Sequence, residues 1–409
     1  MPWKETCAMD ERCLMIADYR KEELSIAELS RRYGISRRTC YKWIERYEAE
    51  GFGGLEDRSH APHDCPHRVS EATAAAVVAV RIAHPTWGPK KVQAWLDEHK
   101  PGRPWPALST IGELFDGAGL TVSRKRKRRV PASAPFHSCV APNDTWTVDF
   151  KGWFRTADGR RCDPLTLSDA YSRYLLRCQA VDRPDGVSVW PIFDAAFREF
   201  GLPRAMRSDN GSPFASTAAG GLSRLSVRLI KAGIVPERIA PGKPQQNGRH
   251  ERFHLTLKRE TADPPAANRR AQQRRFDAFR TLYNEERPHE ALKQTPPSRH
   301  YRPSPRRYSG RLREPDYPDD FLIRRVRSNG EIKWRGEFVF VSQVLAGEPV
   351  GCEQTDDGIW TLHFGPIKLG LIDHRGRLYV PSRSRGDGSE RTANLQAPRT
   401  QNVLPIIPV

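Results

Sequence analysis

The sequence has no apolar run long enough to span a bilayer, and its N-terminus lacks the pattern of a signal peptide. Its 8 cysteines, at positions 7, 13, 40, 65, 139, 162, 178 and 352, show neither CxxC spacing nor the arrangement of a disulfide framework. These absences argue against a membrane protein and against a disulfide-rich secreted protein. They favour a cytoplasmic protein with reduced thiols.

Acidic residues are outnumbered in this chain. Its 49 Asp and Glu residues stand against 67 Lys and Arg, so the net charge of the 409 residues is +18. Such an excess favours a polyanionic partner, and without a membrane span nucleic acid is preferred over an acidic membrane. The length allows two to four domains with substantial cores. We therefore expect a multidomain protein that handles DNA or RNA.

Residues 1–58 have the pattern of a helix-turn-helix domain. Apolar residues recur at helical spacing on both sides of Gly34, and Ser25 and Ser36 are suited to cap the two helices. The second helix leaves a polar and basic face of the kind that reads base edges in the major groove. The alternative is a solvated basic face on an ordinary helical hairpin. We predict DNA contacts for the residues of this face, Arg37, Arg38, Tyr41 and Lys42.

A linker rich in proline and histidine, residues 59–68, follows this domain. It lacks the second ligand pair of a structural zinc site, so we interpret it as solvated. Helical patterning over residues 69–130 predicts a second DNA-binding domain, of helix-turn-helix or winged type. This domain closes in a run suited to DNA phosphates, Arg124, Lys125, Arg126, Lys127, Arg128 and Arg129.

After a second linker, residues 131–142, the pattern of residues 143–303 is that of an α/β domain. Strands are predicted over 145–150, 164–168, 174–181 and 204–207. Helices are predicted over 186–200, 222–232, 248–260 and a longer segment ending near residue 283. This order implies a mixed sheet covered by helices. Beyond it we predict a linker (304–319), a small basic β-barrel (320–381) and a disordered tail (382–409).

Three acidic residues of the α/β domain lie at positions where a carboxylate could bind a metal ion or a ligand. Asp149 interrupts the strand "TWTVDFKG", where a buried carboxylate must either be paired with a basic residue or hold a metal. Asp209, in "RSDNGSPF", follows a short strand and would point into the crevice at its carboxyl end. Glu251 lies in the first turn of a helix that Asn247 can cap, on the same face as Lys258.

Each of these acids also has an ordinary structural explanation. Asp149 could form a salt bridge in the core, Asp209 could cap the Asn-Gly turn, and Glu251 could favour its helix terminus through the dipole. That all three coincide by chance, in this order and with these flanking residues, is improbable. Other titratable neighbours are assigned to structural or helix-surface positions, Asp144, Asp169, His250 and His254.

Together these motifs resemble the DDE integrase-core transposases of bacterial insertion sequences, relatives of retroviral integrases. The likeness covers nearly the whole chain and includes "SDNG", "QQNGRHERFHLTLK" and "YNEERPHEALKQTPPSRHY". It implies an RNase H-like core whose catalytic and metal-binding residues are Asp149, Asp209 and Glu251. It also implies DNA contacts by Gln246, Asn247 and Lys258.

The spacing of the acids agrees with the resemblance. Asp149 and Asp209 enclose 59 residues, within the range of the family, and Asp209 and Glu251 enclose 41, slightly more than is usual. The segment "AAGGLS", residues 218–223, resembles a small loop or helix extension that absorbs the difference. Glu260 is the rival third acid, but it lacks the preceding Gln-Asn-Gly helix start.

Three carboxylates suit phosphodiester chemistry. Mg²⁺ prefers oxygen ligands, and two such ions about 3.5–4 Å apart activate the attacking oxygen and stabilise the leaving one. The resemblance implies that Asp149 contacts both Mg²⁺ ions, or Mn²⁺ in their place, while Asp209 and Glu251 each hold one. It also implies double-stranded DNA as partner, both element ends and target, and a homodimer or higher oligomer that joins two ends. The expected location is the cytoplasm, in association with the nucleoid.

Two other functions remain open. A domesticated transposase would bind specific DNA as a regulator without cutting it, and retention of the acidic triad argues against this. A Mg²⁺-dependent nuclease would cut DNA without joining it, and an assay scored for both products separates this case. The sequence indicates neither the terminal repeat nor the target preference.

Overall fold

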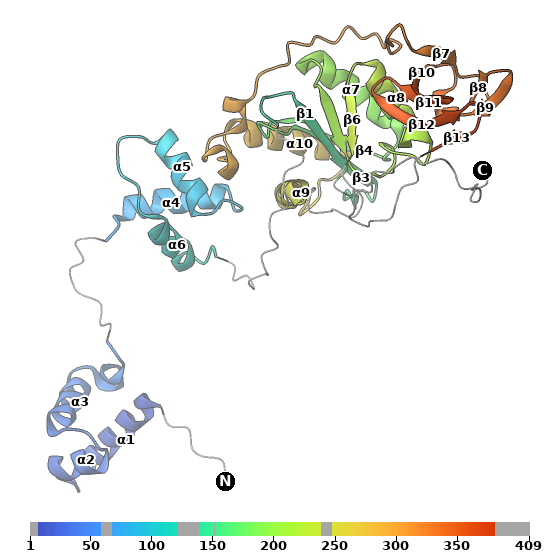
Figure 1. Cartoon of the computed structure of the whole chain (residues 1–409). Coiled ribbons are helices and arrows are strands. Elements are labelled where there is room, and N and C mark those ends of the chain that lie inside the picture. Colours follow the sequence, from blue (N-terminus) through green and yellow to red (C-terminus); the bar gives the residue numbers. More distant parts are fainter. Residues whose placement is uncertain (1–6, 59–67, 122–138, 151, 239–247, 381–409) are drawn as a thin grey trace, which may run out of the picture. The chain divides into compact units, whose positions relative to one another are not determined.

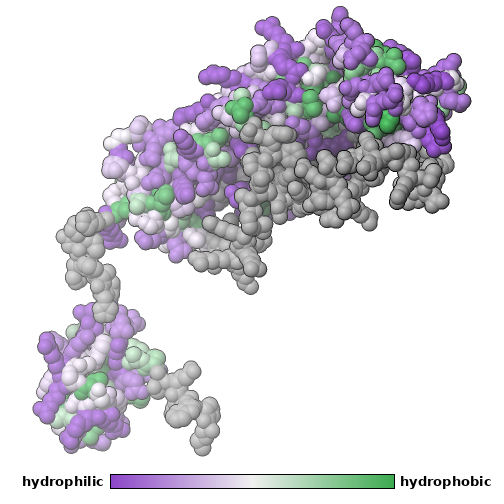
Figure 2. Space-filling view, in the orientation of Figure 1, coloured by the Kyte–Doolittle hydropathy of each residue, from purple (hydrophilic) through white to green (hydrophobic). Residues whose placement is uncertain are grey.

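The computed structural model describes residues 7–58, 68–121, 139–150, 152–238 and 248–380 (Figure 1). The chain divides into two compact units, Met1–Val69 and Ser70–Val409. Most of the first predicted linker, all but the last residues of the second, and the predicted disordered tail lie outside the described residues. On the face seen in Figure 2, hydrophilic residues cover most of both units, with hydrophobic residues in small patches.

Within residues 7–58 the structure has three α-helices, α1 (Ala8–Arg20), α2 (Ile26–Arg32) and α3 (Arg37–Glu50), and a short 3₁₀ helix, η1 (Gly51–Leu55). Ser25 and Ser36 cap α2 and α3, which confirms that prediction. Gly34 turns the chain between them at φ 63°, a conformation that favours glycine. α1 was not predicted, although its Met15 and Ile16 are buried in the core of the unit.

The second unit begins with three helices among residues 68–121, α4 (Glu71–Ala83), α5 (Pro89–His99) and α6 (Leu108–Gly117). All three fall where helical patterning predicts them. Their shared core includes Val77, Trp87, Leu96 and Phe115. No strand is present in this range, so the winged alternative has no support among the residues described there.

A mixed sheet forms the centre of the α/β domain, in the order β4–β3–β1–β5–β6 with β2 beside β3. β1 (Thr145–Phe150) is antiparallel to β3 (Arg161–Asp169) and parallel to β5 (Ala205–Ser208). β4 (Leu175–Val181) continues the antiparallel side, and β6 (Val235–Arg238) continues the parallel side. β2 (Phe154–Arg155) and β6 were not predicted. β2 has two residues, and β6, "VPER", carries the proline and charges that only an edge strand tolerates.

Helices cover both faces of this sheet (Figure 1). On one face, α7 (Gly186–Phe200) and α8 (Arg224–Lys231) pack on Trp146 and Val148 of β1. On the other, α9 (Gly248–Thr261) and α10 (Arg269–Glu285) pack on residues of β3 and β4 such as Cys162 and Leu175. The two faces of β1 are therefore different, apolar toward α7 and α8 and polar toward α9.

The last turn of α10 and the segment after it hold the beginnings of β4 and β1. Asn284 donates to the carbonyl of Leu175 (3.0 Å) and accepts from its N–H (2.8 Å), which satisfies both backbone groups at the start of β4. After the 3₁₀ helices η4 (Glu290–Leu292) and η5 (Pro297–His300), Tyr301 donates to Asn143 Oδ1 at 3.0 Å. Asn143 Oδ1 also accepts from the indole of Trp146 at 2.9 Å. This segment thus closes the domain around the beginning of β1.

The described C-terminal strands form an open five-stranded sheet and a separate hairpin. The sheet has the order β13–β12–β11–β10–β7, and β8 (Glu331–Trp334) pairs with β9 (Glu337–Phe340). The predicted closed barrel is not confirmed, because no described pairing joins the two ends of the sheet. The strands of the sheet are β7 (Leu322–Arg325), β10 (Pro349–Asp356), β11 (Ile359–Phe364), β12 (Ile367–Asp373) and β13 (Leu378–Tyr379).

The C-terminal sheet packs against the predicted insertion. The short 3₁₀ helix η2 (Ala219–Gly221) lies within residues 218–223, and Ala219 and Leu222 share a hydrophobic core with the C-terminal strands. An ion pair of 2.7 Å between Lys231 and Glu348 adds a polar contact. The insertion is therefore a docking element for the C-terminal sheet. None of the described helices is long and apolar enough to cross a membrane.

The stability of the second unit should depend on the charge of His289. Burial, together with the nearby cations Lys91 and Arg173, lowers its pKa to about 4. Since unfolded histidine has a pKa of about 6.5, the unfolded state binds the extra proton between these values, and stability falls as pH falls through that window. Acidification from pH 7 to pH 4.5 should lower the free energy of unfolding of wild type. We expect this fall to be smaller in His289→Leu, by on the order of 2 kcal/mol.

Urea unfolding at both pH values measures this difference. Substitution of the exposed His99 on α5 by leucine is the matched control, which should lose as much stability as wild type. Equal losses in His289→Leu and wild type would contradict the prediction.

Candidate active site

Asp149 lies on the polar face of β1. Trp146 and Val148 point into the core beneath α7 and α8, so strand alternation turns Asp149 toward α9. Its side chain is 11% exposed, and its register partner on β3, Thr166, is also buried. The Thr166 hydroxyl donates to the Asp149 carbonyl at 3.1 Å. The strand thus tolerates a carboxylate because its second face is polar.

Asp209 follows the end of β5, the parallel neighbour of β1. The register pairs Thr147 with Arg207, and its continuation by two residues brings Asp209 level with Asp149. Asp209 Oδ1 also accepts from the Gly211 N–H at 3.2 Å, the turn-capping contact expected of aspartate. The first two acids therefore both lie toward the carboxyl ends of adjacent parallel strands, the edge where ligands bind in open α/β sheets.

Glu251 is the fourth residue of α9, as the sequence predicts, and its side chain lies outside the described part of the structure. Helical geometry places residue 251 one turn before His254 on the same face. His254 Nδ1 lies 4.0 Å from Asp149 Oδ2, and its Nε2 lies 3.2 Å from Thr166 Oγ1. The face of α9 that carries His254 is thus turned toward β1 and β3.

The assignment of His254 to the helix surface is wrong. Its side chain is only 12% exposed and lies between α9 and the sheet. The sequence did contain a signal: apolar Leu257 follows His254 by three residues, a spacing that puts both on one helix face. In the structure Leu257 is fully buried. Sequence reasoning missed it because an imidazole was considered only as a catalytic group.

Glu260, the rival third acid, is engaged elsewhere. Its carboxylate accepts from Arg287 Nη1 at 2.5 Å and from the hydroxyl of Thr86. Arg287 is only 5% exposed, so the ion pair is buried. Together with Thr86 it links α9 to the segment after α10 and to the turn before α5. Lys91 adds a hydrogen bond to the Pro288 carbonyl at the same junction. Glu260 thus has a structural role.

The two other carboxylates near the strands are also structural, which confirms their interpretation. Asp169 accepts from the N–H groups of Asn143 and Ser172, both at 2.7 Å, and burial raises its pKa. Asp144 accepts from the N–H groups of residues 140 and 141. Both therefore hold the turns around β1.

The candidate acids fit a hard divalent cation. Carboxylate oxygens at the ends of two adjacent strands, with a third acid on the facing helix, are the ligand type that Mg²⁺ prefers. Among the residues whose side chains are described, no group of three His, Cys, Asp or Glu residues is arranged to hold a metal. The side chain of Glu251 is not among them, so the trio itself stays a prediction.

The predicted DNA contacts fall into two groups. Arg37, Arg38, Tyr41 and Lys42 are exposed on α3, and Lys258 is exposed on α9. The described structure therefore leaves these side chains accessible to a ligand. The others lie outside the described residues: Arg124, Lys125, Arg126, Lys127, Arg128, Arg129, Gln246 and Asn247.

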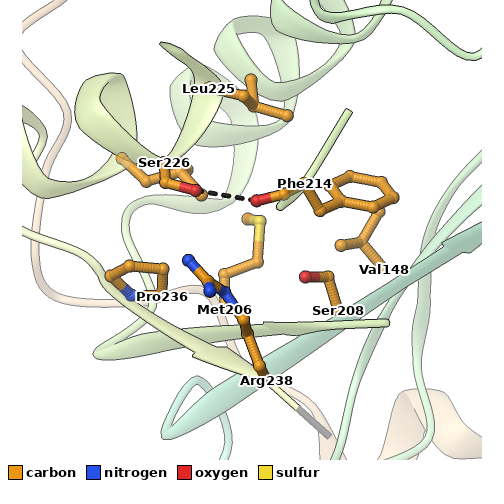
Figure 3. Close-up of a pocket in the computed structure, with 9 residues that line it drawn as sticks. Val148, Met206, Ser208, Phe214, Leu225, Ser226, Pro236 and Arg238 are labelled. Carbon is orange, nitrogen blue, oxygen red and sulfur yellow. Dashed lines mark hydrogen bonds between the residues drawn. The ribbon is translucent and has the colours of Figure 1, made fainter. Parts of the chain in front are cut away.

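A small pocket lies on the opposite face of the sheet from Asp149. Figure 3 shows Val148, Met206 and Leu225 around it, with Ser226 donating a hydrogen bond of 2.8 Å to the Phe214 carbonyl. Its lining is mostly apolar and belongs to the core between the sheet and α8. The pocket is therefore separate from the candidate acids.

Models of known domain families match the chain along most of its length. A helix-turn-helix domain matches residues 11–63, and a homeodomain-like domain matches residues 39–115. Two models of the integrase core domain match residues 140–244 and 232–297. The C-terminal domain of IS481 family transposases matches residues 322–378.

Proteins of two insertion elements are similar to this chain. An uncharacterized 39.2 kDa protein of IS476 from Xanthomonas euvesicatoria is 30% identical over 242 residues, 58% of this chain and 66% of the relative. An uncharacterized 31.7 kDa protein of IS407 from Burkholderia multivorans is 32% identical over 191 residues, 46% of this chain and 66% of the relative. The chain thus spans 66% of the length of both relatives.

Among solved structures, the catalytic core domain of HTLV-2 integrase in complex with magnesium is 15% identical, with a TM-score of 0.32. The match covers 40% of this chain and 99% of that chain. A likeness at this level carries no argument about activity.

Two substitutions on α9 separate the structural glutamate from the candidate ligand. We expect Glu260→Gln to lower the free energy of unfolding by about 3 kcal/mol, because it leaves the buried Arg287 without its anionic partner. If Glu251 serves a site rather than the fold, Glu251→Gln should change stability by less than about 0.5 kcal/mol. Denaturant unfolding of both full-length variants measures this. The reverse order of stabilities would return Glu260 to candidacy as the third acid.

Proposed function

We propose that this chain, which belongs to the integrase-core transposases of insertion sequences, cuts the ends of its element and joins them to target DNA. The observation that carries the proposal is the placement of Asp149 and Asp209 at one end of the parallel strands β1 and β5. α9 faces this end, and it carries Glu251 one turn before a residue that contacts Asp149. This arrangement supports a site built from all three acids.

In this proposal the three carboxylates hold two Mg²⁺ ions, with Mn²⁺ as an alternative. Bound there, the ions would supply activation of the attacking oxygen and stabilisation of the leaving oxygen at phosphorus. Asp149, on the central strand, would contact both ions, while Asp209 and Glu251 would each contact one. The chain contributes rigidity through the sheet, which carries Asp149 on β1 and Asp209 directly after the parallel neighbour β5.

The reaction consists of two displacements in the same site. In the first, water attacks the phosphodiester at the element end and leaves a 3′-hydroxyl. In the second, that hydroxyl attacks a phosphodiester of the target, so one P–O bond forms as another breaks. Neither step requires a covalent intermediate with the enzyme or a nucleotide cofactor. Lys258, exposed on α9, would hold a phosphate of the element end as a point charge.

Recognition of the element end falls to the helical domains. The exposed basic face of α3 would enter the major groove, with Arg37 and Arg38 near the helix start where base contacts are made. The basic run of residues 124–129 would contact phosphates. Because two ends must be joined to one target, we propose a homodimer or a larger assembly as the active form.

Two alternative functions make different predictions. A regulator would bind the element ends and yield no DNA product in any divalent cation. A nuclease would yield cut ends without joined ones. The placement of both aspartates at the strand ends favours catalysis over binding alone, since a binding protein gains nothing from two acids that repel DNA.

The first test is Asp149→Asn in an assay with element-end oligonucleotides, target DNA and Mg²⁺. We expect loss of both cut and joined products, by at least a factor of about 10³, because the charge that holds the cations is removed. Binding of the element end should stay nearly intact. With Ca²⁺ in place of Mg²⁺, wild type should bind without turnover.

The control is Asp277→Asn, which alters an exposed acid on α10 and should leave both products unchanged. Unaltered joining by Asp149→Asn would contradict the proposed site. Cut products without joined ones from wild type would favour the nuclease.

The second test concerns α3. We expect Arg38→Ala to weaken binding of the element end by about 1–3 kcal/mol and to reduce discrimination against unrelated DNA, as for a residue that contacts a base edge. Lys21→Ala, at the end of α1, is the control and should change neither. Fluorescence anisotropy with specific and unrelated duplexes measures both quantities, and equal weakening on the two duplexes would assign Arg38 to phosphates instead.

A further inference from the structure

His254 connects α9 to the strand that carries Asp149. Its Nε2 lies 3.2 Å from Thr166 Oγ1, and the single hydroxyl proton of Thr166 is donated to the Asp149 carbonyl at 3.1 Å. With that proton on the carbonyl, the Nε2–H tautomer of His254 completes the chain by donating to the threonine oxygen. The result is a chain of two hydrogen bonds from the helix, through β3, to the backbone of β1. His254 Nδ1 lies 4.0 Å from Asp149 Oδ2, beyond hydrogen-bond distance.

We propose that His254 is a positioning residue that sets the distance and rotation of the first turns of α9 relative to β1, and so aligns Glu251 with Asp149. The inference rests on the proposed function, because it assumes that these two acids share cations. It assigns His254 no proton transfer and no contact with DNA.

The anchors of α9 are unevenly distributed, which gives this contact its weight. The second half of the helix is held by Leu257, packed with Phe276 and Phe279, and by the pair of Glu260 with Arg287. The first half carries the candidate ligand; there the ring of Phe253 packs against Phe279 and Tyr283 of α10, and His254 makes a polar contact with β3. Phe253 holds this half against α10, whereas His254 joins it to β3, so loss of the hydrogen bond frees the rotation of the helix start relative to β1. A displacement of about 1 Å in a site of this kind costs about 10²-fold in rate.

A merely space-filling role is the competing explanation, and matched variants distinguish the two. His254→Met fills a similar volume without a donor, whereas His254→Gln keeps an N–H donor at similar reach. Thr166→Val removes the intervening hydroxyl with little change in shape. If the hydrogen-bonded chain matters, His254→Met and Thr166→Val should share one defect, and His254→Gln should recover most of it.

The experiment measures Mn²⁺ binding to the full-length protein, by the electron paramagnetic resonance signal of the free ion, alongside cutting and joining of element-end DNA. We expect His254→Met and Thr166→Val each to weaken Mn²⁺ binding and to lower the joining rate by about 10–100-fold, as is typical of residues that support metal ligands. The double variant should be no worse than either single variant, because both break one chain. His254→Gln should fall within a few-fold of wild type.

Affinity for element-end DNA in Ca²⁺ and the melting temperature should change little in these variants. His374→Met, in the exposed turn before β13, is the matched control and should resemble wild type in every measurement. Mn²⁺ binding and joining at wild-type levels in His254→Met would overturn the inference. So would a His254→Gln variant as defective as His254→Met, which would indicate packing alone.

The two levels of the proposal fail differently. If wild type binds Mn²⁺ but yields neither cut nor joined DNA, the proposed function fails while the Mn²⁺ titration still decides the role of His254. If wild type is active and the His254 variants bind Mn²⁺ normally, only the positioning role fails.

Discussion

Parallel pairing of β1 with β5 is the contact on which the candidate active site depends. In a parallel pair the carboxyl ends of both strands lie at one edge of the sheet. Residues at equivalent positions near these ends are therefore close in space. Asp149 lies near the end of β1 and Asp209, 60 positions later in the chain, directly follows β5, so the parallel pairing places both toward one edge of the sheet. The rest of the domain stabilises this pair of strands and covers them.

Covering β1 poses a physical problem, because one face of the strand is apolar and the other carries a carboxylate. The apolar face packs under α7 and α8, as a core strand normally does. The polar face is covered by α9, whose His254 and the facing Thr166 provide polar partners in place of hydrocarbon. A buried acid is costly unless such partners or a cation are present. The same helix carries Glu251, so the element that makes the acid tolerable also carries the proposed third ligand.

Much of this could be predicted from local patterns. The strand around Asp149 follows from alternation, the bounds of α7 from its apolar spacing, and the start of α9 from the residues before it. Some of the features that the sequence did not predict depend on contacts between distant segments. β6 contains a proline that only an edge strand accepts, and whether the C-terminal strands close into a barrel is decided by pairings that no local pattern contains. α1 was missed although Met9, Cys13 and Ile16, at helical spacing, all pack in the core of the first unit. His254 was misassigned because only a catalytic role was considered for its imidazole, although Leu257 marks the same face of α9 as apolar.

The central claim is that three acids from two strands and a helix meet around divalent cations, and anomalous diffraction from crystals containing Mn²⁺ and element-end DNA tests it most directly. The account predicts anomalous peaks between Asp149 and Asp209, with oxygens of both and of Glu251 about 2.0–2.2 Å away, as expected for hard cations of this size. Peaks coordinated without Glu251, or located away from the ends of β1 and β5, would contradict it.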